Sequence, residues 1–235
     1  MLAHVREPTR ETMKHFALLA ALALAIVLAG CGLVELGSRE EATDSSSTTQ
    51  VESPDEASQA LQELEVASPG SMSNYSRESF NHWSRANDFG WNAPESSCDA
   101  REAALIRDGE DVEVGSGCKV TSGSWYDPYT DQIFTDPSDI DTDHVVALAN
   151  AWRSGASSWT DEERERYAND PEVLLSVEDN ANQAKGDKGP EAWKPPNEEV
   201  WCDYAEHWIS IKDKYDLSVN PDEKVELEEM LSTCA

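Results

Sequence analysis

The chain divides into three parts by the pattern of its apolar and polar positions. An uninterrupted apolar run extends from Phe16 to Ala29, after a short basic start at Lys14 and His15. Residues 32–72 are rich in Ser, Thr, Glu, Asp and Pro, with no aromatic and few bulky apolar residues. Beyond the apolar run, the first aromatic residue is Tyr75, and from there apolar positions recur at helix and strand spacings. We therefore expect one folded domain over 73–235.

This domain is predicted to mix helices with short strands. Apolar periodicity and capping residues such as Thr160 indicate helices, and β-branched alternation indicates strands. The expected helices are 98–109, 145–155, 160–170, 197–217 and 221–234, with a polar helix or turn at 178–187; the expected strands are 110–114, 118–127 and 173–177. In the helix at 197–217, one apolar stripe combines Val200, Tyr204, Trp208 and Ile211. The pattern predicts an α+β domain.

The polar segment, taken as residues 31–72, is predicted to be a disordered, solvated tether. Such a composition buries too little apolar surface to offset the loss of conformational entropy. Residues 57–67 have helical spacing, but we expect only a transient helix there, because little is available for it to pack against.

The apolar run predicts export. It suits the core of a signal peptide and is short for a membrane-spanning helix, which needs about 20 residues. The run ends in "LAGC", which resembles a bacterial lipobox, so we expect residues 1–30 to be a lipoprotein signal peptide and Cys31 to carry the lipid. The protein would then be extracytoplasmic and anchored to the cell membrane. Met1 or Met13 could be the true start.

The composition is strongly acidic. The chain has 47 Asp and Glu against 18 Lys and Arg, for a formal net charge of -29 at pH 7. This excess weighs against a protein that holds nucleic acid through a broad basic surface.

The cysteines favour two disulfides. With Cys31 assigned to the lipid, four cysteines remain, which is an even set in an exported protein and allows three pairings. Proximity in sequence favours Cys98–Cys118 and Cys202–Cys234. A zinc site would need more closely spaced ligand pairs.

Candidate chemistry is concentrated in two short segments. "DIDTDH" contains Asp141, Asp143 and His144, and a polar segment after the strand at 173–177 contains Asn182 and Lys185. A carboxylate and a side-chain amide are oxygen ligands that suit magnesium, while an imidazole takes a proton from water at neutral pH. A lysine three positions after the asparagine would lie on the same helix face and could neutralise phosphate charge. An acidic loop that binds calcium is the simpler alternative.

Beyond these residues, the sequence resembles the HNH endonucleases, in particular a secreted branch related to the C-terminal nuclease domain of GmrSD-type restriction enzymes. The resemblance rests on ordered blocks that together cover roughly residues 75–234: "CDAREAALIRDG", "WYDPYTDQIFTDPSDIDTDHVVALANAWRSGA", "YANDPEVLLSV", "NQAKGDKGPEAWKPP" and "CDYAEHWISIKDKY". It implies an α+β fold with a ββα-metal core, also called a His-Me finger, and additional helices.

The resemblance also implies roles for individual residues. His144 corresponds to the general base, Asp143 and Asn182 to the ligands of a divalent metal, and Asp141 to a supporting acid near that metal. Lys185 matches a cation near the scissile phosphate, and Arg101 matches a position expected to reach the site. The implied metal is Mg²⁺, with Mn²⁺ as an alternative.

One position departs from the family pattern. The family has an asparagine nine positions before the second metal ligand, which fixes the loop and the histidine, and Val173 stands there in this chain. Asn169 and Asn180 are nearby but out of register.

We therefore expect a monomeric, metal-dependent endonuclease that hydrolyses DNA, or RNA, with low sequence specificity. The competing hypothesis is a non-catalytic cell-surface binding module that retains the fold, which Val173 and the acidic surface favour. An enzyme that acts on another phosphoester is a third.

Overall fold

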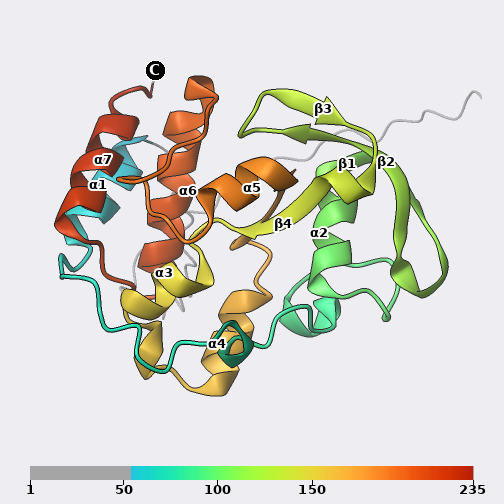
Figure 1. Ribbon diagram of the computed structural model, residues 1–235, viewed down its shortest axis with the longest axis horizontal. Coiled ribbons are helices and arrows are strands. Elements are labelled where there is room, and N and C mark those ends of the chain that lie inside the picture. Colours follow the sequence, from blue (N-terminus) through green and yellow to red (C-terminus); the bar gives the residue numbers. More distant parts are fainter. Residues whose placement is uncertain (1–53, 235) are drawn as a thin grey trace, which may run out of the picture. The chain divides into compact units, whose positions relative to one another are not determined.

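The computed structural model describes residues 54–234, so the predicted signal peptide, Cys31 and the first part of the predicted tether lie outside the described residues. The described chain has a mixed α+β fold with two small sheets and several helices (Figure 1). The helices are α1 (Pro54–Glu63), α2 (Ala100–Asp108), α3 (Leu148–Arg153), α4 (Asp161–Ala168), α5 (Asp179–Lys185), α6 (Trp201–Lys214) and α7 (Pro221–Leu231). The strands are β1 (Gly109–Val114), β2 (Val120–Asp127), β3 (Gln132–Phe134), β4 (Ile140–His144) and β5 (Leu174–Glu178).

The first sheet, with strand order β1-β2-β3, is antiparallel and packs around Trp125. Trp125 is fully buried, and its indole N–H donates to the backbone oxygen of Leu105 on α2 at 2.8 Å. Gly109 and Gly123 leave room for this ring: a Cβ on either glycine would lie within 2.6 Å of a Trp125 atom. The ring therefore joins the sheet to α2.

The second sheet consists of β4 and β5, which pair antiparallel from Ile140↔Glu178 to His144↔Leu174. The acidic motif is therefore a strand, which was not among the strands expected from the sequence. Successive side chains of this segment point to opposite faces, as in any strand. Ile140 and Thr142 share one face and pair with Glu178 and Ser176 on the neighbouring strand. Asp139 lies in the short 3-10 turn Pro137–Asp139 that precedes the strand.

Most predicted helices are confirmed, and their caps explain where they begin. Thr160 caps α4 and forms a reciprocal capping box with Glu163. On α6, the predicted stripe is buried at Tyr204, Trp208 and Ile211, which face the main core shared with α1, α3 and α7. The predicted helix at 145–155 is shorter: α3 begins at Leu148, because Val145 continues the sheet and its N–H donates to the oxygen of Val173 at 2.9 Å.

The predicted tether is wrong from Pro54 onward. Helix α1 packs against α6 and α7 (Figure 1), and its side chains Ala57 and Leu61 are fully buried there. After α1, Val66 forms a parallel bridge with Val219. A few apolar residues at helical spacing are sufficient to hold α1 in the core, because they pack against both α6 and α7. These partners lie far along the chain, so the local sequence could not reveal them.

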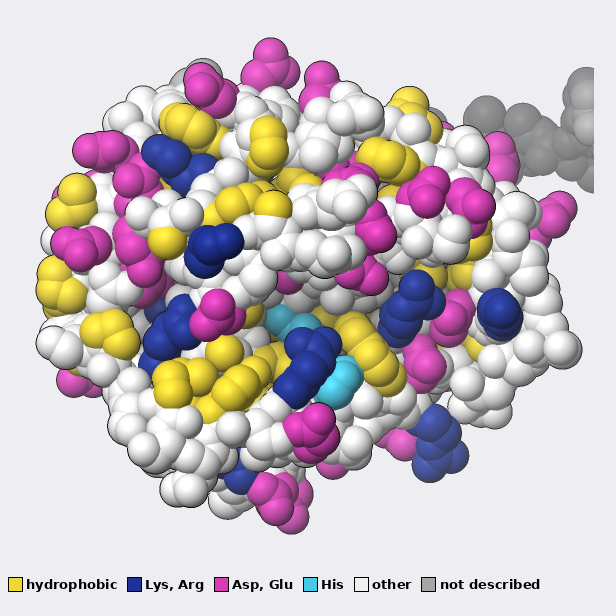
Figure 2. All heavy atoms as spheres, viewed as in Figure 1, with side chains coloured by type: hydrophobic (Ala, Val, Ile, Leu, Met, Phe, Trp, Pro, Cys, Tyr) yellow, Lys and Arg dark blue, Asp and Glu magenta, His cyan; other side chains and the backbone are white. Residues whose placement is uncertain are grey.

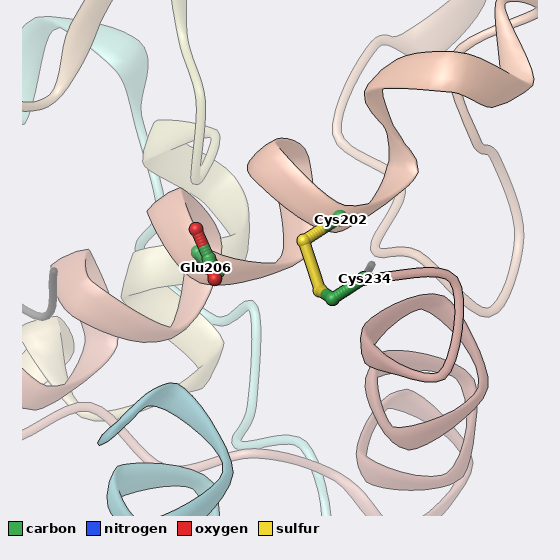
Figure 3. Close-up of side chains that lie close together, drawn as sticks. All are labelled: Cys202, Glu206 and Cys234. Carbon is green, nitrogen blue, oxygen red and sulfur yellow. A yellow bond between two sulfur atoms is a disulfide. The ribbon is translucent and has the colours of Figure 1, made fainter. Parts of the chain in front are cut away.

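Both disulfides favoured by sequence proximity are present, Cys98–Cys118 and Cys202–Cys234. Cys202, Glu206 and Cys234 are the one group of three His, Cys, Asp or Glu side chains within residues 54–234 whose ligand atoms lie close enough to share a metal ion (Figure 3). The two sulfurs are bonded to each other, so they are not available as thiolate ligands. No helix in residues 54–234 has the length and apolar character needed to cross a membrane.

Candidate functional site

The candidate site forms where β4 ends and α5 begins to cover the two-stranded sheet. Helix α5 starts directly after β5, because the Glu178 carboxylate caps it and accepts from the N–H of Ala181 at 2.6 Å. This short connection turns α5 back over β4, so that Asn182 and Lys185 come beside Asp141 and Asp143 (Figure 1). The two segments singled out in the sequence therefore meet.

A cavity of about 200 Å³ opens at this point. It is lined by Tyr75, Arg77, Thr142, Asp143, His144, Ala147, Leu148, Ala149, Asn182, Gly186 and Asp187. On the face drawn in Figure 2, histidine side chains lie beside Lys and Arg side chains near the centre. The cavity brings together three predicted site residues: His144, Asp143 and Asn182.

His144 is held so that one defined ring nitrogen is available. Its Nε2 lies 3.0 Å from the backbone oxygen of Ala168, at the end of α4. A carbonyl oxygen only accepts hydrogen bonds, so Nε2 carries the hydrogen and Nδ1 keeps a lone pair. Burial lowers the pKa of His144 to about 3, so the ring is neutral at pH 7. Its geometry is that of a proton acceptor.

Aromatic rings fix the orientation of the same imidazole. The Trp83 ring centroid lies 5.7 Å from that of His144, and the His82 centroid lies 6.5 Å away, at nearly right angles. His82 Nδ1 is 2.8 Å from the backbone oxygen of Phe80, which holds the second imidazole in turn. These contacts could not be foreseen from the sequence, because His82 and Trp83 lie some sixty positions before His144.

The Asp143 carboxylate is buried, with 4% of the residue exposed. Its Oδ1 accepts from Lys185 Nζ at 2.8 Å and its Oδ2 accepts from the Tyr129 hydroxyl at 2.9 Å. Burial raises the pKa of Asp143 above its ordinary value, while the Lys185 ammonium and the Tyr129 hydroxyl oppose that rise. Each oxygen makes one hydrogen bond here and keeps further acceptor capacity.

The expected role of Lys185 is corrected by its position. The residue is fully buried, and besides Asp143 its Nζ contacts the backbone oxygen of His144 at 3.1 Å. An ammonium committed to two buried acceptors does not face a phosphate in the cavity. Lys185 instead fixes the Asp143 carboxylate and the end of β4. Its place on the same helix face as Asn182 was foreseen, but the direction of its side chain was not.

Asp141 holds the amide of Asn182. Asn182 Nδ2 donates to Asp141 Oδ2 at 3.2 Å, and because a carboxylate only accepts, the amide nitrogen must face Asp141. The amide oxygen of Asn182, a cavity-lining residue, is then directed away from Asp141. Asp141 does not line the cavity itself and contacts it through Asn182.

The expectation that Arg101 reaches the site is wrong. Its guanidinium pairs with Glu102 at 3.0 Å and contacts the backbone oxygen of Ile140 at 3.4 Å. Ile140 begins β4 and His144 ends it, so the end of the strand that Arg101 contacts lies about 13 Å from His144, and Arg101 is not among the residues that line the cavity. Arg101 supports the far end of β4. A different arginine, Arg77, lines the cavity.

With this geometry in hand, comparison with known proteins identifies the domain. Residues 99–230 match the family described as GmrSD restriction endonucleases, C-terminal domain. The chain belongs to this family. An uncharacterized secreted protein from Arthroderma benhamiae is 48% identical over 181 residues, which cover 76% of this chain and 84% of that one. No solved structure matches significantly.

The GmrSD C-terminal domain match contains His144, Asp143, Asn182 and Lys185, but it begins after Tyr75, Arg77, His82 and Trp83. A segment that precedes the matched domain therefore completes the cavity and packs on the histidine. The family pattern could not reveal this segment.

Val173, the position at which the resemblance to HNH endonucleases led us to expect an asparagine, is fully buried in the main core. A nearby asparagine, Asn169, holds the loops around His144 together. Asn169 is fully buried; its Oδ1 accepts from the N–H of Ser84 at 2.8 Å, and its Nδ2 donates to the oxygens of Asn81 and Glu165 at 2.7 and 2.8 Å. It thereby ties the loop bearing His82 and Trp83 to the end of α4, whose last carbonyl holds His144.

The donor set in this GmrSD-type cavity fits a hard divalent cation. Asp143 offers carboxylate oxygens with free acceptor capacity, and Asn182 offers an amide oxygen oriented by Asp141. Magnesium commonly takes one or two protein oxygens and fills its remaining positions with water or phosphate oxygens. These two residues would hold such an ion, and the cavity has room for its waters.

A larger hollow of about 740 Å³ lies elsewhere on the domain and has a different character. Its lining includes six carboxylates, Asp88, Glu162, Glu163, Glu165, Asp170 and Asp216, against Arg166 and Lys214. Such a wall repels phosphate. The smaller cavity at His144 is therefore the better site for a nuclease-type domain.

Proposed function

We propose that this protein is a metal-dependent endonuclease that hydrolyses phosphodiester bonds of DNA, and of RNA as a second substrate, with low sequence specificity. The family match supports nuclease-type chemistry. One observation carries the finer proposal: the His144 ring is neutral, is fixed through Nε2, and lines the same cavity as the oxygen donors Asp143 and Asn182. The antiparallel pair β4 and β5 followed by α5 supports the proposal, because a ββα-metal core would have these elements in this order.

His144 would act as the general base. Nδ1 accepts a proton from a water molecule as the water oxygen attacks phosphorus, and the Nε2–H bond to Ala168 stabilises the imidazolium that forms. The phosphorus–oxygen bond to the leaving group then breaks, and that oxygen takes a proton from solvent. A magnesium-class ion held by Asp143 and Asn182, when bound, would stabilise the negative charge of the transition state.

Burial sets a limit on His144 as a base. A pKa of about 3 ensures that the ring is unprotonated, but it also weakens proton uptake relative to an ordinary imidazole. The negative charge of a bound phosphodiester beside the ring would favour the imidazolium and raise this pKa.

We further propose that the protein acts outside the cytoplasm as a monomer. The apolar run that ends at Ala29, and the word "secreted" in the name of the Arthroderma benhamiae relative, both support export. Lipid attachment at Cys31, and through it a membrane anchor, remains a proposal from the "LAGC" motif alone.

Plasmid nicking tests the proposed function. Supercoiled DNA should be nicked with Mg²⁺ or Mn²⁺, and excess chelator should abolish nicking. Parallel reactions with RNA and with a small aryl phosphodiester define the substrate class. A folded protein that cleaves only the small ester would be a phosphodiesterase of another kind, and one that cleaves none of the three at any salt or metal concentration would be a binding module.

A further inference from the structure

The charges at the cavity are balanced except for one arginine. The lining residue Asp143 is paired with Lys185 at 2.8 Å, and the lining residue Asp187 is paired with Arg153 at 2.7 Å. Arg77 is the only Lys or Arg among the lining residues, and no side chain of the described range 54–234 gives its guanidinium a hydrogen bond or ion pair. In a chain of net charge -29, the cavity therefore has a surplus positive charge.

The backbone at Arg77 is firmly anchored although its side chain is exposed. Arg77 opens a 3-10 turn that ends at Ser79, whose backbone oxygen accepts from Arg164 Nε at 3.1 Å. On one side, Tyr75 packs edge-on against Trp152 with 5.7 Å between ring centroids. On the other, Phe80 is fully buried in the main core. The backbone that carries this cation is therefore held beside the cavity before any ligand binds, so that binding need order only the Arg77 side chain and not its segment.

We propose that Arg77 binds a phosphate of the substrate at the His144 cavity, so that a segment outside the matched domain supplies the phosphate-binding cation. The inference rests on the proposed nuclease function. A guanidinium suits this task because its planar donors engage two phosphate oxygens at once. It also takes over the role that the sequence pattern assigned to Lys185, which the fold has buried in an ion pair.

The test compares Arg77→Gln and Arg77→Lys with Arg85→Gln. Arg85 lies in the same segment, is exposed, and pairs only with Asp88 at 3.2 Å, outside the cavity. In the nicking assay, Arg77→Gln should lower kcat/KM at least tenfold, mainly through KM, and Arg77→Lys should recover part of the loss. In Arg77→Gln, the slope of log KM against log salt concentration should decrease by the amount expected for the loss of about one phosphate contact. Arg85→Gln should stay within twofold of the unaltered protein.

A binding measurement separates this inference from the function on which it rests. In the His144→Ala protein with chelator present, a short single-stranded oligonucleotide should bind at least tenfold more weakly when Arg77→Gln is added. Inorganic phosphate, followed by NMR titration of the unaltered protein, should shift resonances of the cavity in an Arg77-dependent way. If no nucleic acid is cleaved but the binding of both the oligonucleotide and inorganic phosphate depends on Arg77, the nuclease proposal fails and the phosphate site stands. If cleavage occurs and Arg77→Gln matches Arg85→Gln in both assays, the phosphate site is overturned.

Discussion

Replacement of Lys185 by methionine would leave the Asp143 carboxylate buried without its cation. The Lys185 side chain is 0% exposed and that of Asp143 is 5% exposed, and Nζ lies 2.8 Å from Oδ1. Removal of one partner of a buried ion pair costs about 3–5 kcal/mol, because the remaining charge is uncompensated. The substitution also removes the bond from Nζ to the His144 oxygen at 3.1 Å. We therefore expect Lys185→Met to lower the free energy of unfolding by about 3–5 kcal/mol.

Urea unfolding at pH 7, with the disulfides intact, measures this loss. The double variant Asp143→Asn with Lys185→Met should recover most of the stability, since it buries no unpaired charge. Lys188→Met serves as the matched control, because Lys188 is exposed three positions further along the chain and should be neutral.

The competing role for Lys185 gives the opposite result. A lysine that served the substrate would be nearly silent in unfolding, so Lys185→Met would keep full stability and lose only nicking. That outcome would refute the buried ion pair. If Lys185→Met does not fold at all, a folded double variant still supports the pair, and an equally unstable double variant contradicts it.

The remaining predictions concern the core, the loops and pH. Leu61→Ala should destabilise the domain by about 2–5 kcal/mol in urea, while the exposed Gln59→Ala should not, because α1 is part of the core. Asn169→Ala should cost about 2–3 kcal/mol in urea and also slow nicking, because Ser84 N–H loses its acceptor and the loop bearing Trp83 is released. As pH falls from about 6.5 to 5, the unfolded chain should take up protons at His144 and His207 that the folded chain refuses, since burial lowers both folded pKa values. The free energy of unfolding should therefore decrease as the pH is lowered, and His144 should contribute up to about 1.4 kcal/mol per pH unit to this decrease. His144→Gln should remove that contribution.

The sequence predicted the site where its parts are close in the chain or spaced along one element. Asp143 and His144 are adjacent, and Asn182 and Lys185 lie one helical turn apart. Their spacing in the chain was therefore enough to predict that each pair lies close together. The disulfide pairs and the apolar stripe of α6 followed from spacing in the same way.

What depends on the packing of distant segments was not predictable. The direction of Lys185 depends on how α5 lies over β4, and the same residue type could have faced either a phosphate or a carboxylate. Arg77 lines the cavity and Trp83 contacts His144 only because Asn169 and Phe80 fix their segment against α4 and the core. Helix α1 looked unpartnered because its groove is formed by α6 and α7, more than a hundred residues later.

The central claim, that His144 is the base of a nuclease site, is tested most directly by comparison of the buried His144 with the partly buried His207. His207 resembles His144 in that its Nε2 contacts a backbone oxygen, that of Glu172 at 2.6 Å, and burial also lowers its pKa, but it does not line the cavity. With Mg²⁺ or Mn²⁺, His144→Gln should reduce the rate of plasmid nicking by about 10²–10⁴-fold, while His207→Gln, similarly altered in stability, should nick at the unaltered rate. Equal rates for His144→Gln and His207→Gln would contradict the account.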